Sequence, residues 1–327
     1  MIRQNLPSPN LGTSSITRRS LIGVSAAFCA SCVVPEKVVQ SKNATPIAQV
    51  PFRFDYGRRL TVQVAVNSGE SHDFIIDTAA TQSVIFDNLA KKMKLAAQAT
   101  GSAQVYGLSG IKTVPTIDVG TLRLGEVEFN AANAPLLNDW PEVSRTPQGI
   151  IGLDLLSSYV VVFRFQDSIL ELYEANARPK GNWLSEPLYS SNFGVANRPL
   201  YFVNIDFGSS RRVPFLLDTG SFDTVCNFAA ADYLRAVPAL ARDPQERDKV
   251  VDIHGEQLTA YSLRAAQFAI GTIQLAANDI TVMNAPFFRD LGYGDRPFGV
   301  LGLTSLVRRD IAIDFTAREI SFRSTPP

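Results

Sequence analysis

Two aspartates stand at matching points of two similar segments of the chain, residues 74–84 and residues 215–225. In each segment an apolar run precedes an Asp-Thr pair, at Asp77 and at Asp218, and a small residue follows it. The apolar run predicts that the aspartate ends a strand, and the small residue lets another backbone approach closely. One such turn is weak support for chemistry, because an aspartate that caps an ordinary tight turn looks the same.

Two such turns, at matching points of a duplicated chain, predict a paired-carboxylate site. A two-fold axis between the copies would bring the side chains of Asp77 and Asp218 face to face. Carboxylates that lie so close cannot both ionise easily, so they share one proton. One of them then serves as general base on a water molecule, while the protonated one polarises a carbonyl group. This chemistry needs no metal, no cofactor and no covalent intermediate.

The elements that must position these aspartates also occur twice. Alternating strands are predicted upstream of each aspartate, at 60–66 and 201–207, and each is followed by a polar turn. Downstream, a Gly-aliphatic-aliphatic-Gly motif is found at 149–156 and again at 299–306. Strand pairs around a mid-segment glycine are predicted at 117–124 and 268–275, and closing strands at 160–165, 169–173, 311–315 and 319–322. Short helices are predicted at 87–95 and 227–236.

With these motifs in view, the chain resembles the retropepsin-like and pepsin-like aspartic proteases, in the bacterial single-chain form. Residues 216–221, Leu-Leu-Asp-Thr-Gly-Ser, match the active-site signature of the family, and residues 149–156 resemble the second signature of retropepsins. The resemblance spans roughly residues 52–325. It implies an all-β fold of two retropepsin-like (acid protease) β-barrel domains, related by pseudo-two-fold symmetry, with the active site at their interface.

The resemblance also implies a division of the chain. We expect one aspartyl protease domain at 51–180 and a second at 198–327, joined by an interdomain linker at 181–197. Such a chain would be a monomer with an internal pseudo-dimer. Pairing of the copies between two chains is the alternative, although a short linker makes pairing within one chain simpler.

By the same resemblance Asp77 and Asp218 form the catalytic pair. Thr78 and Thr219 would make interlocking bonds between hydroxyl groups and backbone that hold the two turns together. The supporting turns also contain Ala79 in the first copy, and Gly220 and Ser221 in the second.

The first copy departs from the family pattern at two positions. Ala79 stands where the family usually has glycine. The alanine side chain would cause strain if φ were positive there, or it would crowd a substrate. The Ser221 hydroxyl is expected to bond the outer oxygen of Asp218, whereas its counterpart Ala80 has no hydroxyl, so the two carboxylates would differ in basicity.

In the second copy, Thr304 replaces the polar residue that Asp154 supplies in the first.

The family closes a hairpin flap over bound peptide. Two segments have a glycine turn between strand-like flanks, residues 104–110 and residues 251–256. Tyr106 is the preferred flap contact, with Gly107 beside it, and such lids exclude water and position substrate. The alternative for either segment is an ordinary exposed hairpin.

Together these observations predict an aspartic endopeptidase that hydrolyses peptide bonds in an extended polypeptide. A catalytically silent peptide- or protein-binding module on the same fold is the alternative. Ala79 and Thr304 favour that alternative, whereas the retention of both Asp-Thr pairs opposes it. Polypeptide is the expected substrate, with no cofactor and no metal.

Composition and the scarcity of other reactive side chains exclude several classes of protein. The 31 basic and 31 acidic residues balance, which argues against a dedicated nucleic-acid binder. The only histidines, His72 and His254, lie in different copies without a matched serine or a zinc-ligand set. His72 is expected in a solvated turn beside Glu70, and Cys226 as a small buried apolar residue.

The N-terminal 32 residues predict an export signal. Arg18 and Arg19 precede a short apolar run and then small residues, an arrangement that resembles a bacterial twin-arginine signal. The alternative is an untargeted tail. Cys32 follows Ala30-Ser31 and is a candidate lipidation site, although Cys29 stands where an aliphatic residue is usual.

The expected location is therefore the periplasm, either as a membrane-anchored lipoprotein or, after ordinary cleavage, as a soluble product. Residues 33–50 are expected to be a linker, because they are polar and show no periodicity.

Overall fold

The computed structural model describes residues 44–95, 99–139, 147–192, 198–208, 212–235, 247–265, 268–275 and 278–324. All of these described residues belong to one compact unit. The expected export signal, with Cys29 and Cys32, lies outside the described residues. Where the structure is described, it contains no helix that is both long and apolar enough to cross a membrane.

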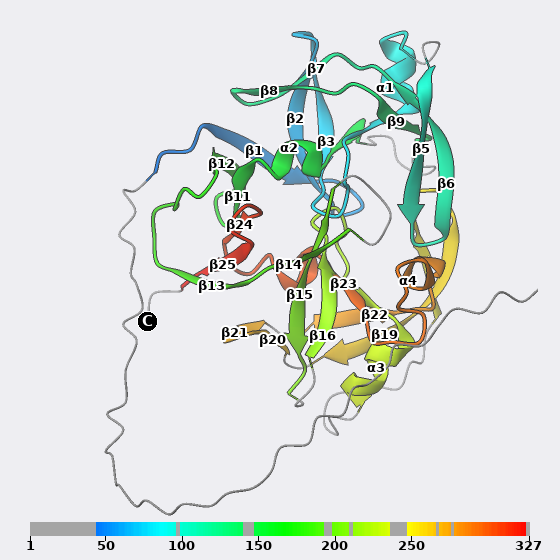
Figure 1. The fold of residues 1–327 in the computed structure, drawn as a ribbon, viewed down its shortest axis with the longest axis vertical. Helices are drawn as coiled ribbons and strands as arrows, with labels where there is room; N and C mark the ends of the chain where they lie inside the picture. Colours follow the sequence, from blue (N-terminus) through cyan, green and yellow to red (C-terminus); the bar gives the residue numbers. More distant parts are fainter. Residues whose placement is uncertain are drawn as a thin grey trace, which may run out of the picture. The chain divides into compact units, whose positions relative to one another are not determined.

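The described residues are mostly β-structure, which confirms the all-β expectation (Figure 1). We call residues 44–180 the first half and residues 181–324 the second half. The strands of the first half are β1 (Ala48–Phe54), β2 (Leu60–Val66), β3 (Ser71–Ile76), β4 (Val84–Phe86), β5 (Ala99–Gly107), β6 (Gly110–Ile117), β7 (Thr121–Leu124), β8 (Val127–Asn130), β9 (Ala134–Leu137), β10 (Gly149–Ile151), β11 (Tyr159–Arg164) and β12 (Ile169–Glu174).

The second half continues the β-structure. Its strands are β13 (Trp183–Pro187), β14 (Tyr189–Ser191), β15 (Leu200–Asp206), β16 (Arg212–Leu217), β17 (Val225–Cys226), β18 (Arg247–Val251), β19 (Gln257–Ala265), β20 (Phe268–Ile270), β21 (Ile273–Leu275), β22 (Asn278–Val282), β23 (Gly299–Leu301), β24 (Ile311–Asp314) and β25 (Glu319–Arg323). The helices are short: α1 (Asp87–Lys92), α2 (Leu153–Leu156), α3 (Phe228–Arg235), α4 (Pro286–Asp290) and one 3₁₀ turn (Leu303–Ser305).

The same three-strand arrangement surrounds the end of β3 in the first half and the end of β16 in the second. Strand β10 pairs parallel to β3 and antiparallel to β4, and β23 pairs parallel to β16 and antiparallel to β17. The Gly-aliphatic-aliphatic motifs form β10 and β23. A Cβ atom on Gly149 would lie 2.2 Å from the Phe74 ring, and one on Gly299 would lie 2.2 Å from the Phe215 ring. The two glycines therefore let a phenylalanine of the neighbouring strand lie flat against the backbone.

One sheet joins the two halves. Strand β11 of the first half pairs antiparallel with β24 of the second, with Val161 opposite Ile313 and Phe163 opposite Ile311. On either side the order is β1-β12-β11 and β24-β25-β13. The side chains of Val161, Phe163, Ile311 and Ile313 are all fully buried, so the core is continuous across this join.

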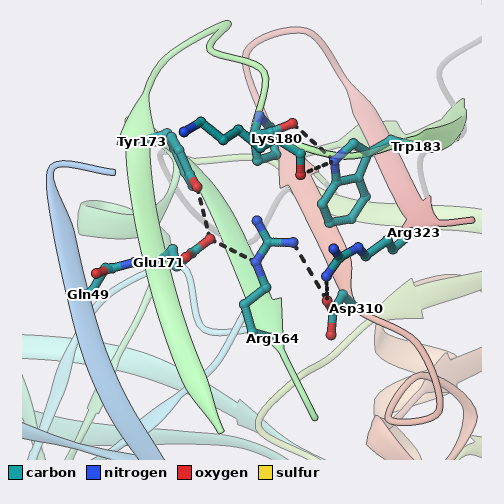
Figure 2. A network of polar contacts seen from close by, with 9 residues as sticks. Gln49, Arg164, Glu171, Tyr173, Lys180, Trp183, Asp310 and Arg323 are labelled. Atoms are coloured by element: carbon teal, nitrogen blue, oxygen red, sulfur yellow. Dashed lines mark hydrogen bonds and ion pairs between the residues drawn. The ribbon is translucent and has the colours of Figure 1, made fainter. Parts of the chain in front are cut away.

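A buried polar network covers part of this sheet (Figure 2). Glu171 accepts hydrogen bonds from Arg164 Nε (2.9 Å), the Tyr173 hydroxyl (2.9 Å) and Gln49 Nε2 (3.0 Å). Asp310, at the start of β24, pairs with Arg164 at 3.6 Å and with Arg323 at 3.0 Å. The Arg164 guanidinium also lies 5.2 Å from the centre of the Trp183 ring. Buried charged side chains of both halves, Arg164, Glu171 and Asp310, thus neutralise one another.

Most predicted elements occur within one or two residues of their expected bounds. The differences lie where segments pair with strands distant in sequence. The linker expected at 181–197 contains β13 and β14, which pair with β25 and β15, and the linker expected at 33–50 ends in β1, where Ala48 and Val50 are buried. The expected hairpin at 268–275 is confirmed as β20 and β21. The one expected at 117–124 is wrong, because β6 ends at Ile117 and β7 pairs with β2 and β8 instead.

Candidate active site

Asp77 and Asp218 each follow a strand that runs parallel to a glycine-motif strand. The Asp77 backbone N–H donates to the Ile151 carbonyl (3.0 Å), and the Asp218 N–H donates to the Leu301 carbonyl (3.1 Å). These bonds extend the β3–β10 and β16–β23 ladders by one residue and so fix the start of each turn. The apolar runs that precede the aspartates form the buried ends of β3 and β16.

The two carboxyl groups are hydrogen-bonded to each other. Oδ1 of Asp77 also accepts the backbone N–H groups of Ala79 (2.7 Å) and Ala80 (3.0 Å), and Oδ1 of Asp218 accepts that of Ser221 (2.9 Å). Both aspartates are partly buried. The two turns and their two carboxyl groups therefore meet where the halves join.

Their surroundings shift the two pKa values unequally. Burial raises the pKa of Asp218 well above its usual range, and the negative charge of Asp77 raises it further. Burial also raises the pKa of Asp77. Backbone N–H groups oppose the rise at both carboxyls, from Ala79 and Ala80 at Asp77 and from Ser221 and Gly220 at Asp218, so the charge of Asp77 makes the difference. The proton that the pair shares is therefore held mainly by Asp218, and Asp77 is the ionised partner.

The two turns are locked together by their threonines, both of which are fully buried. The Thr78 hydroxyl donates to the Leu217 carbonyl (2.8 Å) and accepts the Thr219 N–H (3.1 Å). The Thr219 hydroxyl donates to the Ile76 carbonyl (2.8 Å) and accepts the Thr78 N–H (3.2 Å). The four bonds cross between the halves, so the spacing of the two aspartates depends on them.

The residues that follow the threonines differ between the halves. A Cβ atom on Gly220 would lie 2.5 Å from Cγ of Asp77, so glycine is required there by direct contact with the other carboxyl group. Ala79 does not have a positive φ, and its N–H is bonded to Asp77. The backbone strain considered for Ala79 is therefore absent.

Ser221 does not act as expected. Its hydroxyl donates to the Asp223 carbonyl (2.9 Å), and its backbone N–H is the group that reaches Asp218. Ala80 offers the same backbone N–H to Asp77, so the missing hydroxyl does not distinguish the two carboxylates. The difference in pKa between the two carboxyl groups comes instead from the negative charge of Asp77, which raises the pKa of Asp218.

Asp154 and Thr304 occupy equivalent places behind the turns. Asp154 accepts the Ser83 hydroxyl (2.7 Å) and N–H (3.0 Å), and Ser83 in turn accepts the Gly152 N–H. In the second half the Thr224 hydroxyl accepts the Gly302 N–H (3.1 Å), and hydroxyl contacts from Thr304 and Ser305 replace the carboxylate. The substitution at Thr304 is thus compensated locally.

Asp77 and Asp218 line one cavity of about 350 Å³. Its walls are largely apolar and come from both halves, including Ile75, Leu137 and Ile150 of the first and Leu216, Phe222 and Val300 of the second. The Arg58 guanidinium lies 5.1 Å from the centre of the Phe222 ring, which brings the turn before β2 to the rim.

Both segments considered as flaps are hairpins that line this cavity. Strands β5 and β6 pair up to Gly107 opposite Gly110, and Tyr106 and Gly107 line the cavity. Strands β18 and β19 pair up to Val251 opposite Gln257, and Asp252 and Ile253 line it too. The structure therefore brings together all the candidate site residues except Cys32, which is outside the described residues.

Two residues that line the cavity were not predicted from the sequence. Asp252 is only 4 % exposed and contacts the first hairpin, and Arg59 lines the cavity with its guanidinium paired to Asp55. A carboxylate in a hairpin turn between apolar strands was the only available signal for Asp252.

The interpretation of His72 is wrong. It lies buried near the start of β3, just after the exposed turn, and its Nδ1 contacts Gln148 Oε1 at 2.5 Å. The apolar face of the strand extends one residue further toward its start than the polar neighbours suggested.

Cys226 is fully buried, as expected, and burial raises the pKa of its thiol, which makes it a poor nucleophile.

Across the described ranges no group of three or more His, Cys, Asp or Glu side chains has the arrangement of a metal site. The carboxyl pair is thus the main cluster of reactive groups in the cavity.

The first half of the chain is similar to a known protein family. Residues 62–155 match the family model described as aspartyl protease. The matched region contains β2, the Asp77 turn, the β5–β6 hairpin and the β10 glycine motif, all of which belong to the first half. No curated protein matches the chain.

Proposed function

We propose, with the aspartyl protease match of residues 62–155 as the premise, that this chain is an aspartic endopeptidase. Asp77 and Asp218 would be its catalytic pair, and its substrate an extended polypeptide. The observation that carries the proposal is the hydrogen-bonded contact between these two carboxyl groups at the junction of the halves, on one apolar cavity. Two partly buried carboxyls that share a proton are costly to maintain, and hydrolysis is a use that requires both.

The mechanism follows from the unequal pKa values. Asp77, the ionised partner, takes a proton from a water molecule as the water oxygen attacks the scissile carbonyl carbon. Asp218 gives its proton to the carbonyl oxygen, which produces a tetrahedral diol. Asp77 then passes its proton to the amide nitrogen, the C–N bond breaks, and one diol hydroxyl returns a proton to Asp218. Protons and charges balance, so the pair returns to its starting state.

The rest of the cavity would bind and orient the chain. The apolar walls would take side chains on both sides of the scissile bond, and the two hairpins would exclude water above it. The Thr78 and Thr219 interlock would keep the carboxyl groups at a fixed separation, which is the kind of preorganisation on which such catalysis depends.

We further propose that the halves are two aspartyl protease domains related by pseudo-two-fold symmetry within one chain. The recurrence of the β3-β10-β4 arrangement as β16-β23-β17 supports this. The equivalent hydrogen bonds of Ser83 and Thr224 to the second glycine of each motif support it as well.

Export remains a proposal that rests on sequence alone. Arg18, Arg19 and the apolar run after them support a twin-arginine signal, and Cys32 supports a lipid anchor. Fractionation of cells that produce the chain, its Arg18→Lys/Arg19→Lys variant and its Cys32→Ala variant tests this. The double variant should stay in the cytoplasm, and Cys32→Ala should move from the membrane to the periplasm. A chain that fractionates identically in all three forms contradicts both parts.

The silent binding module is not favoured. Its support was Ala79 and Thr304, and the structure gives each a local explanation without loss of the carboxyl contact. The pair itself would serve no purpose in a module that only binds peptide.

Cleavage of a diverse peptide pool, from acidic to neutral pH, tests the proposal. We expect cleavage by the purified chain, inhibition by a statine-type mimic of the diol, and loss of at least about 1,000-fold in rate for Asp77→Asn and for Asp218→Asn. Asp279→Asn is the matched control, because Asp279 is an exposed carboxylate paired with Arg264 away from the cavity. Activity that survives either active-site variant contradicts the assigned chemistry.

A further inference from the structure

The two hairpins that line the cavity are bonded to each other across the junction of the halves. The Asp252 carboxylate, in the turn after β18, accepts both the N–H (2.9 Å) and the hydroxyl (2.6 Å) of Ser109, at the tip of the β5–β6 hairpin. Both bonds end on Oδ2. Hydrogen bonds to a charged acceptor are the stronger ones, and the exposure of Asp252 is only 4 %.

The other oxygen of Asp252 has a separate task. Oδ1 accepts the N–H groups of His254 (2.9 Å) and Glu256 (3.0 Å), which holds its own hairpin turn. The carboxylate is therefore divided: one oxygen shapes the second hairpin, and the other oxygen joins it to the first.

Further contacts surround this joint. His254 Nε2 lies 3.2 Å from the Gly110 carbonyl, and the Phe287 N–H donates to the Leu108 carbonyl at 3.3 Å. A Cβ atom on Gly107 would lie 2.6 Å from Asp252 Oδ2, so the approach of the two hairpins depends on glycine at that position. Lys112 and Glu256 also pair at 2.9 Å, but both are exposed and contribute little.

We propose that Asp252 latches the two hairpins into one lid over the carboxyl pair, and that this latch determines how a polypeptide reaches the cleft. Asp252 is a positioning residue, because it acts through Ser109 on the hairpin that carries Tyr106. A chain with a free end can reach the carboxyl pair from the side of the cleft beneath the joined tips. A chain without a free end is admitted only when the tips part, so the latch favours linear, unfolded chains over closed loops. This part of the proposal rests on the proposed peptidase function, whereas the latch itself does not.

Asp252→Asn isolates the latch from the turn. The amide oxygen can still accept the two N–H bonds of the turn, but its NH₂ group then faces the N–H of Ser109 and can only donate to the Ser109 hydroxyl, so the joint is weakened while the hairpin is kept. Asp118→Asn is the matched control, since Asp118 also accepts the N–H of a turn residue, Gly120, without joining the halves.

Gly107→Ala is an independent second variant. It parts the tips by steric contact and changes no hydrogen-bonding group. Its control is Gly101→Ala on the same strand, where the added Cβ would lie 3.3 Å from the Thr116 hydroxyl and needs only a small adjustment.

Hydrogen exchange without substrate tests the latch directly. We expect residues 104–112 to exchange about tenfold faster in Asp252→Asn and in Gly107→Ala than in the unchanged chain, with both controls at the unchanged rate. Unchanged exchange in Asp252→Asn overturns the proposal, whatever the activity of the protein.

Cleavage of one peptide sequence in linear and in head-to-tail cyclic form tests the access role. We expect the ratio of kcat/KM for the cyclic form to that for the linear form to rise about tenfold in both variants, by roughly the factor by which the latch opens. Faster exchange with an unchanged ratio overturns the access role. If the unchanged chain cleaves neither form, the proposed function has failed, and the latch is judged on exchange alone.

Discussion

At the scale of single residues, the two aspartates have the same neighbours by type but not the same electrostatics. Asp77 accepts two short backbone N–H bonds, and Asp218 faces the charge of Asp77. Asp218, whose pKa is raised more, should therefore determine how the stability of the protein changes as the pH rises.

The first prediction concerns stability and pH. Because the folded pKa of Asp218 is raised, the folded protein binds that proton more tightly than the unfolded chain does. The resulting stabilisation is fully present below the ordinary aspartate pKa of about 3.9 and is lost as the pH rises through the raised folded value. Asp218→Asn removes this loss, so the fall in the free energy of unfolding between pH 4 and pH 7, measured with urea, should be smaller than in the unchanged chain. Asp279→Asn should keep the unchanged pH dependence, and an equal fall in all three proteins contradicts the prediction.

The second prediction concerns Gly220. Replacing it with alanine puts a Cβ atom 2.5 Å from Cγ of Asp77, so the carboxyl group must move away from its partner. We expect Gly220→Ala to lower kcat by about 100-fold, since displacements of about an ångström carry losses of that size. Gly101→Ala should cleave as the unchanged chain does. A fully active Gly220→Ala protein would mean that the exact separation of the carboxyl groups is unimportant.

At the scale of elements, the two turns are held by bonds that each half makes to the other. The third prediction follows from them. Thr78→Val keeps the shape of the side chain but leaves the Leu217 carbonyl and the Thr219 N–H buried without a partner. Each such group costs about 1–3 kcal/mol, so we expect a loss of about 3 kcal/mol in the free energy of unfolding.

Urea unfolding checks that loss, and Thr219→Val should behave alike because its bonds mirror those of Thr78. Thr259→Val, at an exposed position of β19, is the control and should stay within about 0.5 kcal/mol of the unchanged chain. If Thr78→Val and Thr259→Val unfold at the same urea concentration, the bonds between the two turns do not stabilise the protein.

The strands around the aspartates could be predicted because local signals mark them. Alternation at 60–66 and the glycine motifs at 149–156 and 299–306 depend only on neighbouring residues, and the structure places strands at each. What could not be predicted depends on partners far along the chain. Strand β13 is a short edge strand whose only marker is its pairing with β25, and the contact between Asp252 and Ser109 joins residues 143 apart. Periodicity carries no information on such pairings.

For the candidate site, the duplicated Asp-Thr turns were sufficient to identify the residues that meet. The bonds of Ser221 were misjudged because sequence does not distinguish a side-chain donor from a backbone donor in the same turn. His72 was misjudged because two charged neighbours suggested a turn where the chain continues as a strand.

At the scale of the whole molecule, the halves share one sheet and one charged network. Arg164 lies between the carboxylates of Glu171 and Asp310, and Arg323 completes the group (Figure 2). The fourth prediction is that Asp310→Leu costs about 3 kcal/mol in the free energy of unfolding, because it removes one of the two carboxylates that neutralise the buried Arg164 guanidinium. The effect should appear as a lower urea midpoint with a single transition.

The exposed pair of Arg264 and Asp279 provides the comparison. Asp279→Leu should change the free energy of unfolding by no more than about 0.5 kcal/mol, because water already solvates both groups. A similar small change for Asp310→Leu would mean that the network does not stabilise the join between the halves.

The shared sheet has a consequence for the order in which the molecule can be completed during synthesis. Strand β11 is made about 150 residues before its partner β24, so a nascent first half exposes an apolar strand edge until the last stretch of the chain leaves the ribosome. The carboxyl pair is likewise absent until Asp218 has been made and β23, which holds its turn, has followed.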